Sequence, residues 1–401
     1  MIKGKFVDIV QAEEGFLRGP FGSALKKSLF VPKGEDTYKV YEQGVVLQQD
    51  KSFGEYHISK QYFEESLKRF EVKSGDFLVS CSGMNYGAIY QLKGKIEKGV
   101  INQALLRIRL NHDMVDDNYF LYYFRTYIVK KIIRGTGDST IPNFPPISVV
   151  KSIEIELPDI EKQRKIGQML ACIDNKVDNN ITLIQELESM AKTIYDYWFL
   201  QFEFPNEDGK PYKSSGGKMV WNDELKREIP ERWRNSSFSE LLEIGNGRDH
   251  KELVDGNVPV YGSGGVMRAV DMPIYNGESV LIPRKGTLNN IIYVNGAFWT
   301  VDTMFYTKMK KPNSAIFAYY SVKLYDFEKL NTGTGVPSMT SSIIYNLKVV
   351  IPPEEVLKSF DNYVQTFYKQ MNEKEKENRE LVSVRDFLLP LLMNGQVGFK
   401  N

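Results

Sequence analysis

The chain has 401 residues, of which 42% are hydrophobic and 12% aromatic, as expected for a folded protein of two or three domains. Its 52 basic and 51 acidic residues give a net charge of +1, which excludes a global field that would draw the chain to nucleic acid or acidic lipid. No apolar run reaches the ~18 residues of a membrane span, and no signal-type segment opens the chain. We therefore expect a cytoplasmic protein that binds no membrane and uses local patches for any DNA contact.

Residues 1–155 are predicted to form a globular α+β domain. Residues 76–80 and 104–110 are short, apolar and flanked by Gly, Asn and Asp, which is typical of strands. Residues 118–133 have the pattern of a helix, and the Pro-rich segment 141–146 ends regular structure.

Residues 156–200 are predicted to form a first long spacer helix. Apolar residues recur there in alternating steps of three and four, which is a heptad seam, and Asn180 is its polar interruption. The seam residues are Ile166, Leu170, Ile173, Val177, Ile184, Leu187, Ala191, Ile194 and Trp198.

Residues 201–350 are predicted to hold a linker and a second globular domain. The polar, Gly-rich run 206–218 is expected to be a solvated linker. After this linker the pattern of elements predicted for the first domain is repeated. We expect strands at 279–282 and 298–306, a helix at 315–325 and a loop at 332–342.

Residues 351–401 are predicted to form a second long spacer helix and a C-terminal tail. Adding 194 to the first seam gives a second one, and it carries Leu157-Pro158 onto Ile351-Pro352. The second seam consists of Phe360, Val364, Phe367, Met371, Lys374, Asn378, Leu381, Arg385, Leu388 and Leu392. A duplication of this size indicates two similar tasks. The expected fold is α+β, with two globular domains in a pseudo-twofold repeat separated by two long antiparallel coiled-coil helices.

An antiparallel register that matches residue n with 558 − n is favoured. It sets Asn180 against Asn378 and Ala191 against Phe367, and it leaves Ile173 to meet Arg385 and Ile184 to meet Lys374. The residues expected to pair the helices are Ile166, Leu170, Ile173, Asn180, Leu187, Ala191, Phe360, Phe367, Met371, Asn378, Leu381 and Leu388.

Catalytic motifs are mostly absent from the sequence. The run 143–146 resembles the loop of adenine methyltransferases, but the inserted Phe144 spoils its spacing and no Gly-rich turn for S-adenosylmethionine precedes it. Glu71-Val72-Lys73 fits only part of a nuclease motif, and there is no Walker-type phosphate loop. The three histidines are scattered, so neither a metal site nor a catalytic residue is predicted.

Both domains contain Gly-rich loops with hydroxyl, amide and basic side chains. Glycine lets a backbone approach a phosphate, while Arg, Lys, Asn and Gln can read base edges. The candidate DNA contacts in the first domain are Lys26, Lys27, Ser82, Asn85, Tyr86, Gln103, Arg134 and Thr136. Those in the second are Arg248, Tyr261, Ser263, Arg284, Lys285, Thr287, Asn289, Thr334 and Ser338.

With these helices, linker and loops, the chain resembles the specificity subunit of a Type I restriction-modification system over essentially its whole length. The resemblance is carried by LPDIEKQRKIGQMLACIDNKVDNN, FPNEDGKPYKSSGGKMVWNDELKREIPERW, IPPEEVLKSFDNYV and LLPLLMNGQV, and by the loops GPFGS, YGSGG and IPRKGT. One departure is the start, MIKGKFVDIVQ, which lacks the Pro-x-x-Trp opening present at Pro230 to Trp233.

This resemblance implies a non-catalytic reader of double-stranded DNA. Each globular domain would be a target recognition domain for one half of an asymmetric bipartite site, and the helices would space them. Two modification (methyltransferase) subunits would dock on the helices, with restriction (translocase and nuclease) subunits outside. S-adenosylmethionine, ATP and Mg would belong to those partners, and no cofactor to this chain. Two alternatives stay open: a coiled-coil adaptor with two domains for other ligands, and a fused methyltransferase or nuclease.

Overall fold

The computed structural model describes residues 2–83, 85–134, 144–333 and 335–398. The chain divides into two compact units: unit 1 is Met1–Asn179 with Glu377–Asn401, and unit 2 is Asn180–Lys376. Each unit holds one globular domain and one stretch of each long helix, α6 (Ile160–Tyr195) and α10 (Glu354–Met393). Within the described residues, neither of these helices nor any other is apolar enough over a membrane-spanning length to cross a bilayer.

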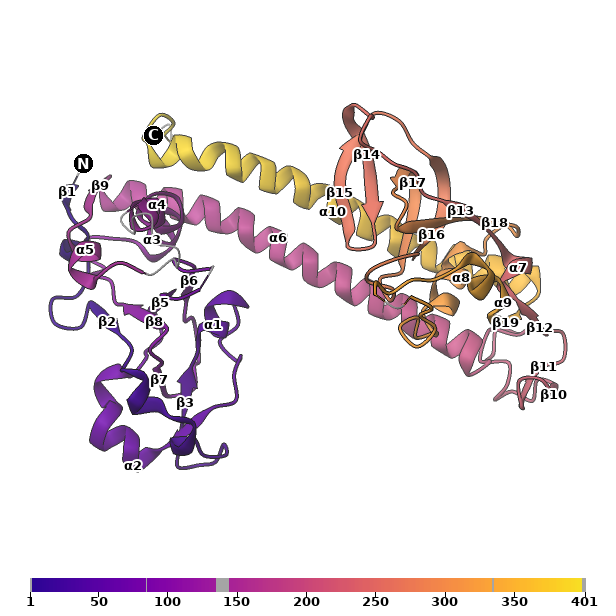
Figure 1. Ribbon diagram of the computed structural model, residues 1–401, viewed down its shortest axis with the longest axis horizontal. Coiled ribbons are helices and arrows are strands. Elements are labelled where there is room, and N and C mark those ends of the chain that lie inside the picture. Colours follow the sequence, from indigo (N-terminus) through magenta and orange to yellow (C-terminus); the bar gives the residue numbers. More distant parts are fainter. Residues whose placement is uncertain (1, 84, 135–143, 334, 399–401) are drawn as a thin grey trace. The chain divides into compact units, whose positions relative to one another are not determined.

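Unit 1 is built on small, mostly antiparallel sheets (Figure 1). A four-stranded antiparallel sheet has the order β2 (Phe16–Arg18), β8 (Leu105–Ile108), β5 (Phe77–Ser80) and β6 (Ile89–Gln91). A three-stranded sheet has the order β4 (His57–Ser59), β3 (Thr37–Tyr41) and β7 (Gly99–Ile101), with β3 parallel to β7. Strand β1 (Ile2–Lys5) pairs antiparallel with β9 (Glu154–Leu157). Strand β9 ends two residues after the domain boundary expected at 155.

The helices of unit 1 pack on different faces of its sheets. These helices are α1 (Gln43–Leu47), α2 (Lys60–Tyr62), α3 (Asp117–Tyr123), α4 (Val129–Arg134) and α5 (Ile147–Lys151). Helix α3 lies on the face of the four-stranded sheet that carries Phe77, α1 lies on the opposite face with Leu78, and α2 lies beside the three-stranded sheet. A π-helical turn at Phe124–Ile128 joins α3 to α4, which confirms the helix predicted at 118–133. The Asp116 carboxylate caps α3 by accepting a hydrogen bond from the Tyr119 N–H, at 2.9 Å. Aromatic packing fills the core: the rings of Phe77 and Phe120 meet edge to face at 4.9 Å.

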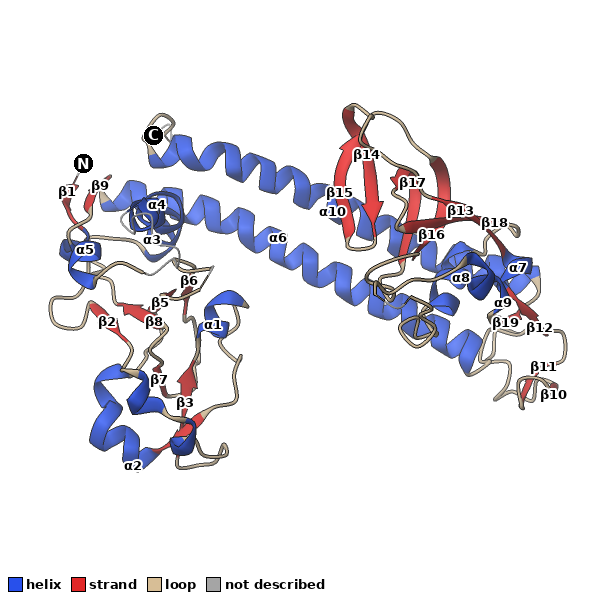
Figure 2. Cartoon of the chain, viewed as in Figure 1, coloured by secondary structure: helices blue, strands red, loops and turns tan. Residues whose placement is uncertain are grey.

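In unit 1 the first part of α6 lies against the last part of α10, and the C-terminal end of α10 is near the start of α6 (Figure 2). Arg385 Nη1 donates to Asp174 Oδ1 at 2.7 Å, and Lys176 pairs with Glu377 at 3.5 Å. Because the partner number falls along α10 as it rises along α6, the two segments are antiparallel. Arg385 therefore meets Asp174, whereas the expected register set it against Ile173. Asp174 is the better partner because a carboxylate satisfies the guanidinium.

The seam residues of unit 1 are buried to different degrees. Ile166 and Leu170 are buried in the core that includes Leu392, and Leu388 packs against it. Ile173, Asn378 and Leu381 are half-buried. Cys172, one position before the seam, is exposed.

Unit 2 is built on a larger sheet. Its six strands have the order β13 (Leu242–Asn246), β18 (Met304–Met309), β16 (Tyr275–Pro283), β17 (Ile292–Thr300), β14 (Asp255–Gly262) and β15 (Gly265–Val270). Two further pairs are β10 (Met219–Asn222) with β11 (Arg227–Pro230), and β12 (Arg234–Ser237) with β19 (Lys348–Ile351). The single strand predicted at 298–306 is wrong. It is the end of β17 and the start of β18, because a turn intervenes in which the Met304 N–H donates to the Val301 carbonyl.

The short helices of unit 2 are α7 (Phe238–Leu241), α8 (Ala315–Val322) and α9 (Ser341–Asn346). Every residue of α8 is buried, and α8 confirms the helix predicted at 315–325 over its first eight residues. Hydroxyl groups link α8 to the long helices: Tyr368 donates to Tyr320 at 3.0 Å, and Tyr195 pairs with Ser321 at 3.0 Å.

In unit 2 the later part of α6 and the first part of α10 are also antiparallel. A π-helical turn at Asp196–Leu200 extends α6, and the Phe199 ring meets Phe360 at 4.8 Å. Leu187, Ala191, Phe360 and Met371 are buried in one core with Phe367 packed against it, and Asn180 is also buried.

The linker is more ordered than its composition predicts. Residues 206–210 and 213–216 are mostly exposed, as expected. However, Phe204 stacks on Tyr212 at 4.6 Å and on Trp233 at 5.0 Å. The aromatic residues inside this polar run therefore anchor it to unit 2.

Candidate nucleic-acid interface

The candidate loops of unit 1 meet at one set of backbone hydrogen bonds, which we call the loop junction of that unit. The Gly19 N–H donates to the Leu105 carbonyl at 2.9 Å, and the Leu105 N–H donates to the Asn102 carbonyl at 3.1 Å. The Asn102 N–H donates to the Tyr41 carbonyl, and the Cys81 N–H donates to the Ala104 carbonyl, at 3.0 and 2.8 Å. Loops 19–23, 81–88 and 102–104 and the end of β3 are thereby held together.

Unit 2 repeats this junction bond for bond. The Gly247 N–H donates to the Met304 carbonyl at 3.2 Å, and the Met304 N–H donates to the Val301 carbonyl at 2.9 Å. The Val301 N–H donates to the Tyr261 carbonyl at 3.0 Å, and the Arg284 N–H donates to the Thr303 carbonyl at 2.8 Å. Gly19 therefore corresponds to Gly247, Tyr41 to Tyr261, and Cys81 to Arg284.

A glycine is required at the same point of both junctions. A Cβ on Gly19 would lie 1.8 Å from the Asn102 carbonyl oxygen, and one on Gly247 would lie 1.9 Å from the Val301 carbonyl oxygen. Since both obstacles are backbone atoms, no side chain fits.

The loop after the third strand of each sheet is braced by a neighbouring side chain or turn. In unit 1 the Gln43 amide donates to Ser80 Oγ at 2.8 Å and to the Ser82 carbonyl at 2.6 Å. In unit 2 the Asn290 amide donates to the Ser263 carbonyl at 2.9 Å, and a Cβ on Gly286 would touch Ser263 Oγ at 2.7 Å. The segments between β5 and β6 and between β16 and β17 have eight residues each, and they carry different side chains.

The segment 331–339 joins the cluster in unit 2. The Met339 N–H donates to the Arg284 carbonyl at 2.8 Å, and the Gly286 N–H donates to the Pro337 carbonyl at 3.0 Å. Ser338 forms an isolated antiparallel β-bridge with Lys285 through the backbone, and the Ser338 N–H donates to Asn331 Oδ1 at 2.8 Å. Loops 246–248, 261–265 and 284–291 and the segments 331–333 and 335–339 are therefore held together.

The sequence matches, over residues 21–189 and 230–381, the family described as Type I restriction modification DNA specificity domain. The chain belongs to this family.

Its relatives share most of its length. It is 26% identical over 374 residues to the Type I restriction enzyme MjaIX specificity subunit of Methanocaldococcus jannaschii, with 86% of this chain and 83% of that protein covered. It is 20% identical over 400 residues to the Type I restriction enzyme HindI specificity subunit of Haemophilus influenzae, with 81% and 87% covered. Its fold is similar to that of the Type-I restriction-modification system S subunit from M. genitalium, with a TM-score of 0.62, 16% identity and 98% and 95% of the chains covered.

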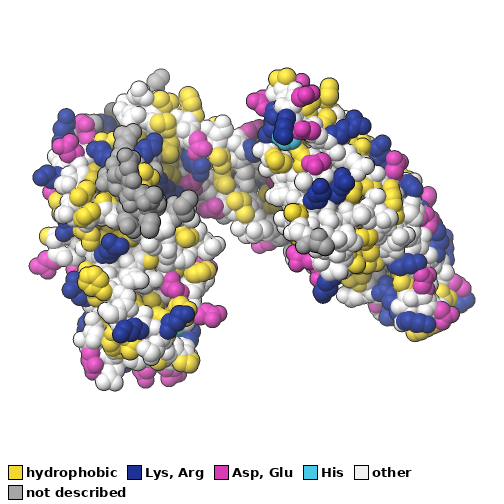
Figure 3. Space-filling model, viewed as in Figure 1, with side chains coloured by type: hydrophobic (Ala, Val, Ile, Leu, Met, Phe, Trp, Pro, Cys, Tyr) yellow, Lys and Arg dark blue, Asp and Glu magenta, His cyan; other side chains and the backbone are white. Residues whose placement is uncertain are grey.

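Several side chains that are predicted to contact DNA are exposed in these loops. Arg248, Lys285 and Thr287 are exposed in unit 2. Lys26, Lys27, Asn85 and Gln103 are exposed in unit 1, and Gln103 lies beside Gly22. Arg284 is half-buried, with its guanidinium 5.8 Å from the centre of the Phe305 ring. Lysine and arginine are interspersed with acidic residues over the visible face, which agrees with the neutral net charge (Figure 3).

Other predicted contacts have structural partners. The Asn289 amide donates to Asp326 Oδ1 at 3.2 Å, and its Oδ1 accepts from the Phe327 N–H at 2.8 Å. Tyr86 packs against the core, and Tyr261 meets Phe298 edge to face at 6.4 Å. Arg134 ends α4, while Thr136 and Thr334 lie outside the described residues.

Sequence reasoning missed one conspicuous side chain in these loops. Phe21 is 89% exposed, more than any other large hydrophobic residue of the described chain. Its loop is fixed on both sides, because Gly19 rests on Asn102 and Gly22 rests on Gln103. The signal was present in the sequence, since a phenyl ring between Gly-Pro and Gly-Ser has few apolar neighbours to cover it.

The described residues offer little for catalysis. They contain no group of three or more His, Cys, Asp or Glu side chains placed to hold a metal ion. Burial raises the pKa of the Cys81 thiol to about 12, so it is not a thiolate near neutral pH.

Proposed function

We propose that this chain is a non-catalytic DNA-reading subunit of a Type I restriction-modification complex. The domain within residues 1–155 reads one half of an asymmetric bipartite site, and the domain within residues 201–350 reads the other. The observation that carries this proposal is the loop junction, which recurs bond for bond in both units while the side chains around it differ. Two half-sites of different sequence can be read by two domains that share the same backbone arrangement but carry different side chains.

The partners and cofactors follow from the same proposal. Two modification subunits dock on α6 and α10 and bring S-adenosylmethionine, and restriction subunits bring ATP and Mg. The curated relatives are named as specificity subunits of Type I restriction enzymes, which supports this assignment. With a net charge of +1, the chain needs partners to supply part of the grip on the DNA phosphates. The complex would work in the cytoplasm, where the host DNA is.

The test is selection of duplexes from a random library by the chain together with its modification subunits. We expect enrichment of two short motifs at a fixed separation. Exchanging loop 284–291 for that of a relative should change only one of the two motifs. No enrichment with modification subunits present would overturn the proposal in favour of an adaptor. S-adenosylmethionine binding or DNA cleavage by this chain alone would instead favour an enzyme.

The separation of the motifs gives a second test. Inserting one heptad at equivalent seam positions of both helices adds about 10.5 Å, or roughly three base pairs. Both motifs should stay the same while their separation grows. A folded variant that binds its partners yet keeps the original separation would show that helix length does not set it.

A further inference from the structure

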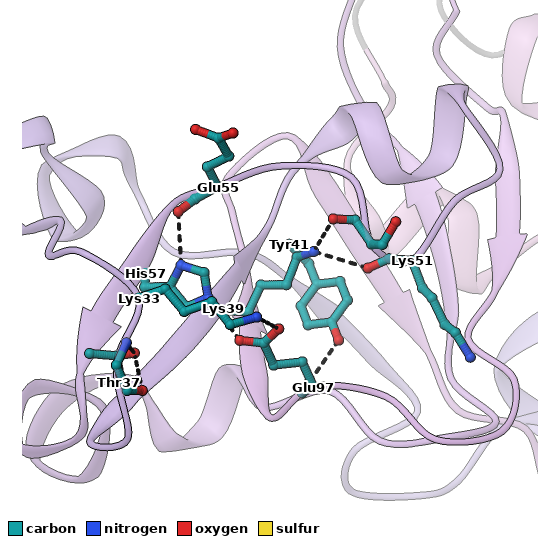
Figure 4. Close-up of polar contacts among 10 residues, drawn as sticks. Lys33, Thr37, Lys39, Tyr41, Lys51, Glu55, His57 and Glu97 are labelled. Atoms are coloured by element: carbon teal, nitrogen blue, oxygen red, sulfur yellow. Dashed lines mark hydrogen bonds and ion pairs between the residues drawn. The ribbon is translucent and has the colours of Figure 1, made fainter.

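Unit 1 contains a basic cavity apart from its loop junction, with a volume of about 670 Å³. Four lysines line it, Lys33, Lys39, Lys51 and Lys95, against two glutamates, Glu55 and Glu97. The remaining lining residues are Pro32, Ser52, Gly54, His57 and Ile96. Figure 4 shows the carboxylate of Glu55 pointing away from the other labelled side chains, so Glu97 is the acid inside the group.

The carboxylate of Glu97 is already fully engaged. Its Oε2 accepts from Lys33 Nζ at 2.8 Å, and its Oε1 pairs with His57 Nε2 at 2.8 Å. Burial alone would raise the pKa of Glu97, but the hydrogen bonds from Lys33 and His57 outweigh it and hold the pKa below its usual value. This acid therefore bonds directly to Lys33 and His57, and it acts on Lys39 only through its charge.

Lys39 is the most unusual group in the cavity. Its side chain comes from the middle of β3 and is only 2% exposed. Its ammonium donates to the carbonyls of Lys51 and Ser52, at 3.1 and 2.7 Å, and within the described residues it makes no ion pair. An ammonium has three donors, so one is left, and a buried charge without a counter-ion is costly. Desolvation accordingly lowers the pKa of Lys39, against the opposing attraction of Glu97.

We propose that this cavity binds a phosphate group, with Lys39 at its floor and Lys51 and Lys95 at its rim. A phosphate supplies a directly bonded negative charge, which Lys39 lacks, and an acceptor oxygen for its third donor. Lys95 is exposed, so its ammonium can turn toward an anion. The Lys51 ammonium donates to the Lys93 carbonyl at 2.8 Å and extends away from Lys39 in Figure 4, so it has to swing away from that carbonyl to reach an anion. A cation would be repelled by the lysines, and an apolar ligand would leave Lys39 uncompensated.

The phosphate has two sources, the backbone of bound DNA and a free nucleotide or pyrophosphate. The DNA source rests on the proposed function. Lys39 precedes Tyr41 of the loop junction by two residues on β3, or about 7 Å. A duplex whose bases met the loops could therefore place a backbone phosphate over the cavity, where it would fix the register of the DNA without reading its sequence.

Histidine NMR separates these cases because the chain has three histidines and only His57 lines the cavity. The full chain, with labelled histidines, is titrated with pyrophosphate and then with the selected duplex. We expect pyrophosphate to move the His57 signals and leave those of His112 and His250 in place. The duplex should move His57 and also His250, which follows the Gly247-Arg248 loop. If only pyrophosphate moves His57, the occupant is a free phosphate compound; if neither does, the proposal is overturned.

Matched variants give the second arm. Lys95→Gln and Lys51→Gln should each weaken duplex binding about threefold to tenfold, equally on selected and random sequence, and reduce the salt slope by about one. Lys60→Gln removes the same charge from an exposed lysine of unit 1 that pairs with Asp36, and it should change little. Lys39→Met keeps the buried stem and should abolish the pyrophosphate response of His57; if it does not fold, the two rim variants decide. Loss of DNA binding with an intact pyrophosphate response would refute the proposed function and leave the cavity assignment standing.

Discussion

The two globular domains share a plan and differ at one strand. In unit 2, β17 is continuous over nine residues, pairing with β16 along most of its length and with β14 in parallel at its end. In unit 1 the same two pairings are divided between β6, which pairs with β5, and β7, which pairs with β3. Residues 92–98 lie between these two short strands. Unit 1 therefore has two short strands, β6 and β7, in place of one continuous strand. It keeps the antiparallel and the parallel pairing and has an additional connecting segment.

That segment is where the basic cavity arises. Lys95, Ile96 and Glu97 all belong to it, and they line the cavity beneath β3. The continuous β17 leaves no such segment in unit 2. The comparison shows how a duplicated fold acquires a site in one copy while the loop junction stays the same in both.

The largest effect is expected at Gly167, whose counterpart in the second long helix, 194 residues later, is Asp361. A Cβ on Gly167 would lie 2.5 Å from the Tyr119 backbone nitrogen and 2.7 Å from Asp116 Oδ1. Gly167→Val should therefore destabilise unit 1 by about 2–3 kcal/mol, measured by thermal unfolding. Gly264→Val, where a Cβ meets nothing within 4 Å, should have little effect. Unchanged unfolding of the Gly167 variant would show that α6 and α3 can separate freely.

A second test concerns Arg284, which stands where unit 1 has Cys81. Arg284→Ala should weaken DNA binding by about 2 kcal/mol and relax sequence preference in one half-site only. Competition binding with duplexes altered in either half measures this. Arg232→Ala, at an exposed residue paired with Glu355, is the control. Equal loss on selected and random duplexes would make Arg284 a phosphate contact.

Asp361 gives a pH-dependent contrast with its glycine counterpart. It is 6% exposed, and burial, with the nearby Glu278 charge, raises its pKa from 3.8 to about 6. Because the folded state favours the protonated form, the stability of the chain falls as the pH rises from about 4 through 6. Asp361→Asn should therefore raise the free energy of unfolding by about 2 kcal/mol at pH 7 and by almost nothing below pH 4. Denaturant unfolding across this range is the measurement, and an equal effect at both ends would contradict the assignment.

The smallest effect is expected at Phe21, which has no apolar counterpart at Gly247-Arg248-Asp249. An exposed phenyl ring on a fixed loop can stack on a base or wedge a base step. Phe21→Ala should leave unfolding unchanged and weaken binding by about 1 kcal/mol, with the loss confined to one half-site. Phe387→Ala, at a phenylalanine of α10 that is 68% exposed, is the control for the isolated chain. Equal losses in the two variants would assign no DNA contact to Phe21.

The elements with periodic apolar patterns were predictable from sequence. The seams predicted both long helices and their antiparallel pairing. Leu170, on α6, and Leu392, near the end of α10, are accordingly buried in one core. The offset of 194 also carries β9 onto β19 residue for residue. Local pattern determines these features, so one sequence is enough to find them.

Features that depend on distant partners were not predictable. Lys39 and Arg109 are charged residues that were not predicted to lie in a core, yet both are buried. Arg109 can be buried because residues distant in sequence compensate it: Asp76 accepts from its Nε at 2.7 Å, Glu14 pairs with its guanidinium, and the Glu71 carbonyl accepts from its Nη2 at 2.9 Å. In the same way, Asn289 was predicted to contact DNA, but its Oδ1 accepts a hydrogen bond from the Phe327 N–H.

The pairing of β1 with β9 and of β12 with β19, which closes the segments 2–157 and 234–351, has a consequence for how such proteins change. Ile2 pairs with Leu157 as Arg234 pairs with Ile351, so each segment begins and ends at the same place, on its own two-stranded ladder. A domain closed in this way can be replaced through recombination at two neighbouring points, while the rest of the chain keeps its hydrogen bonds. A host could thus acquire a new DNA target by exchanging one cassette.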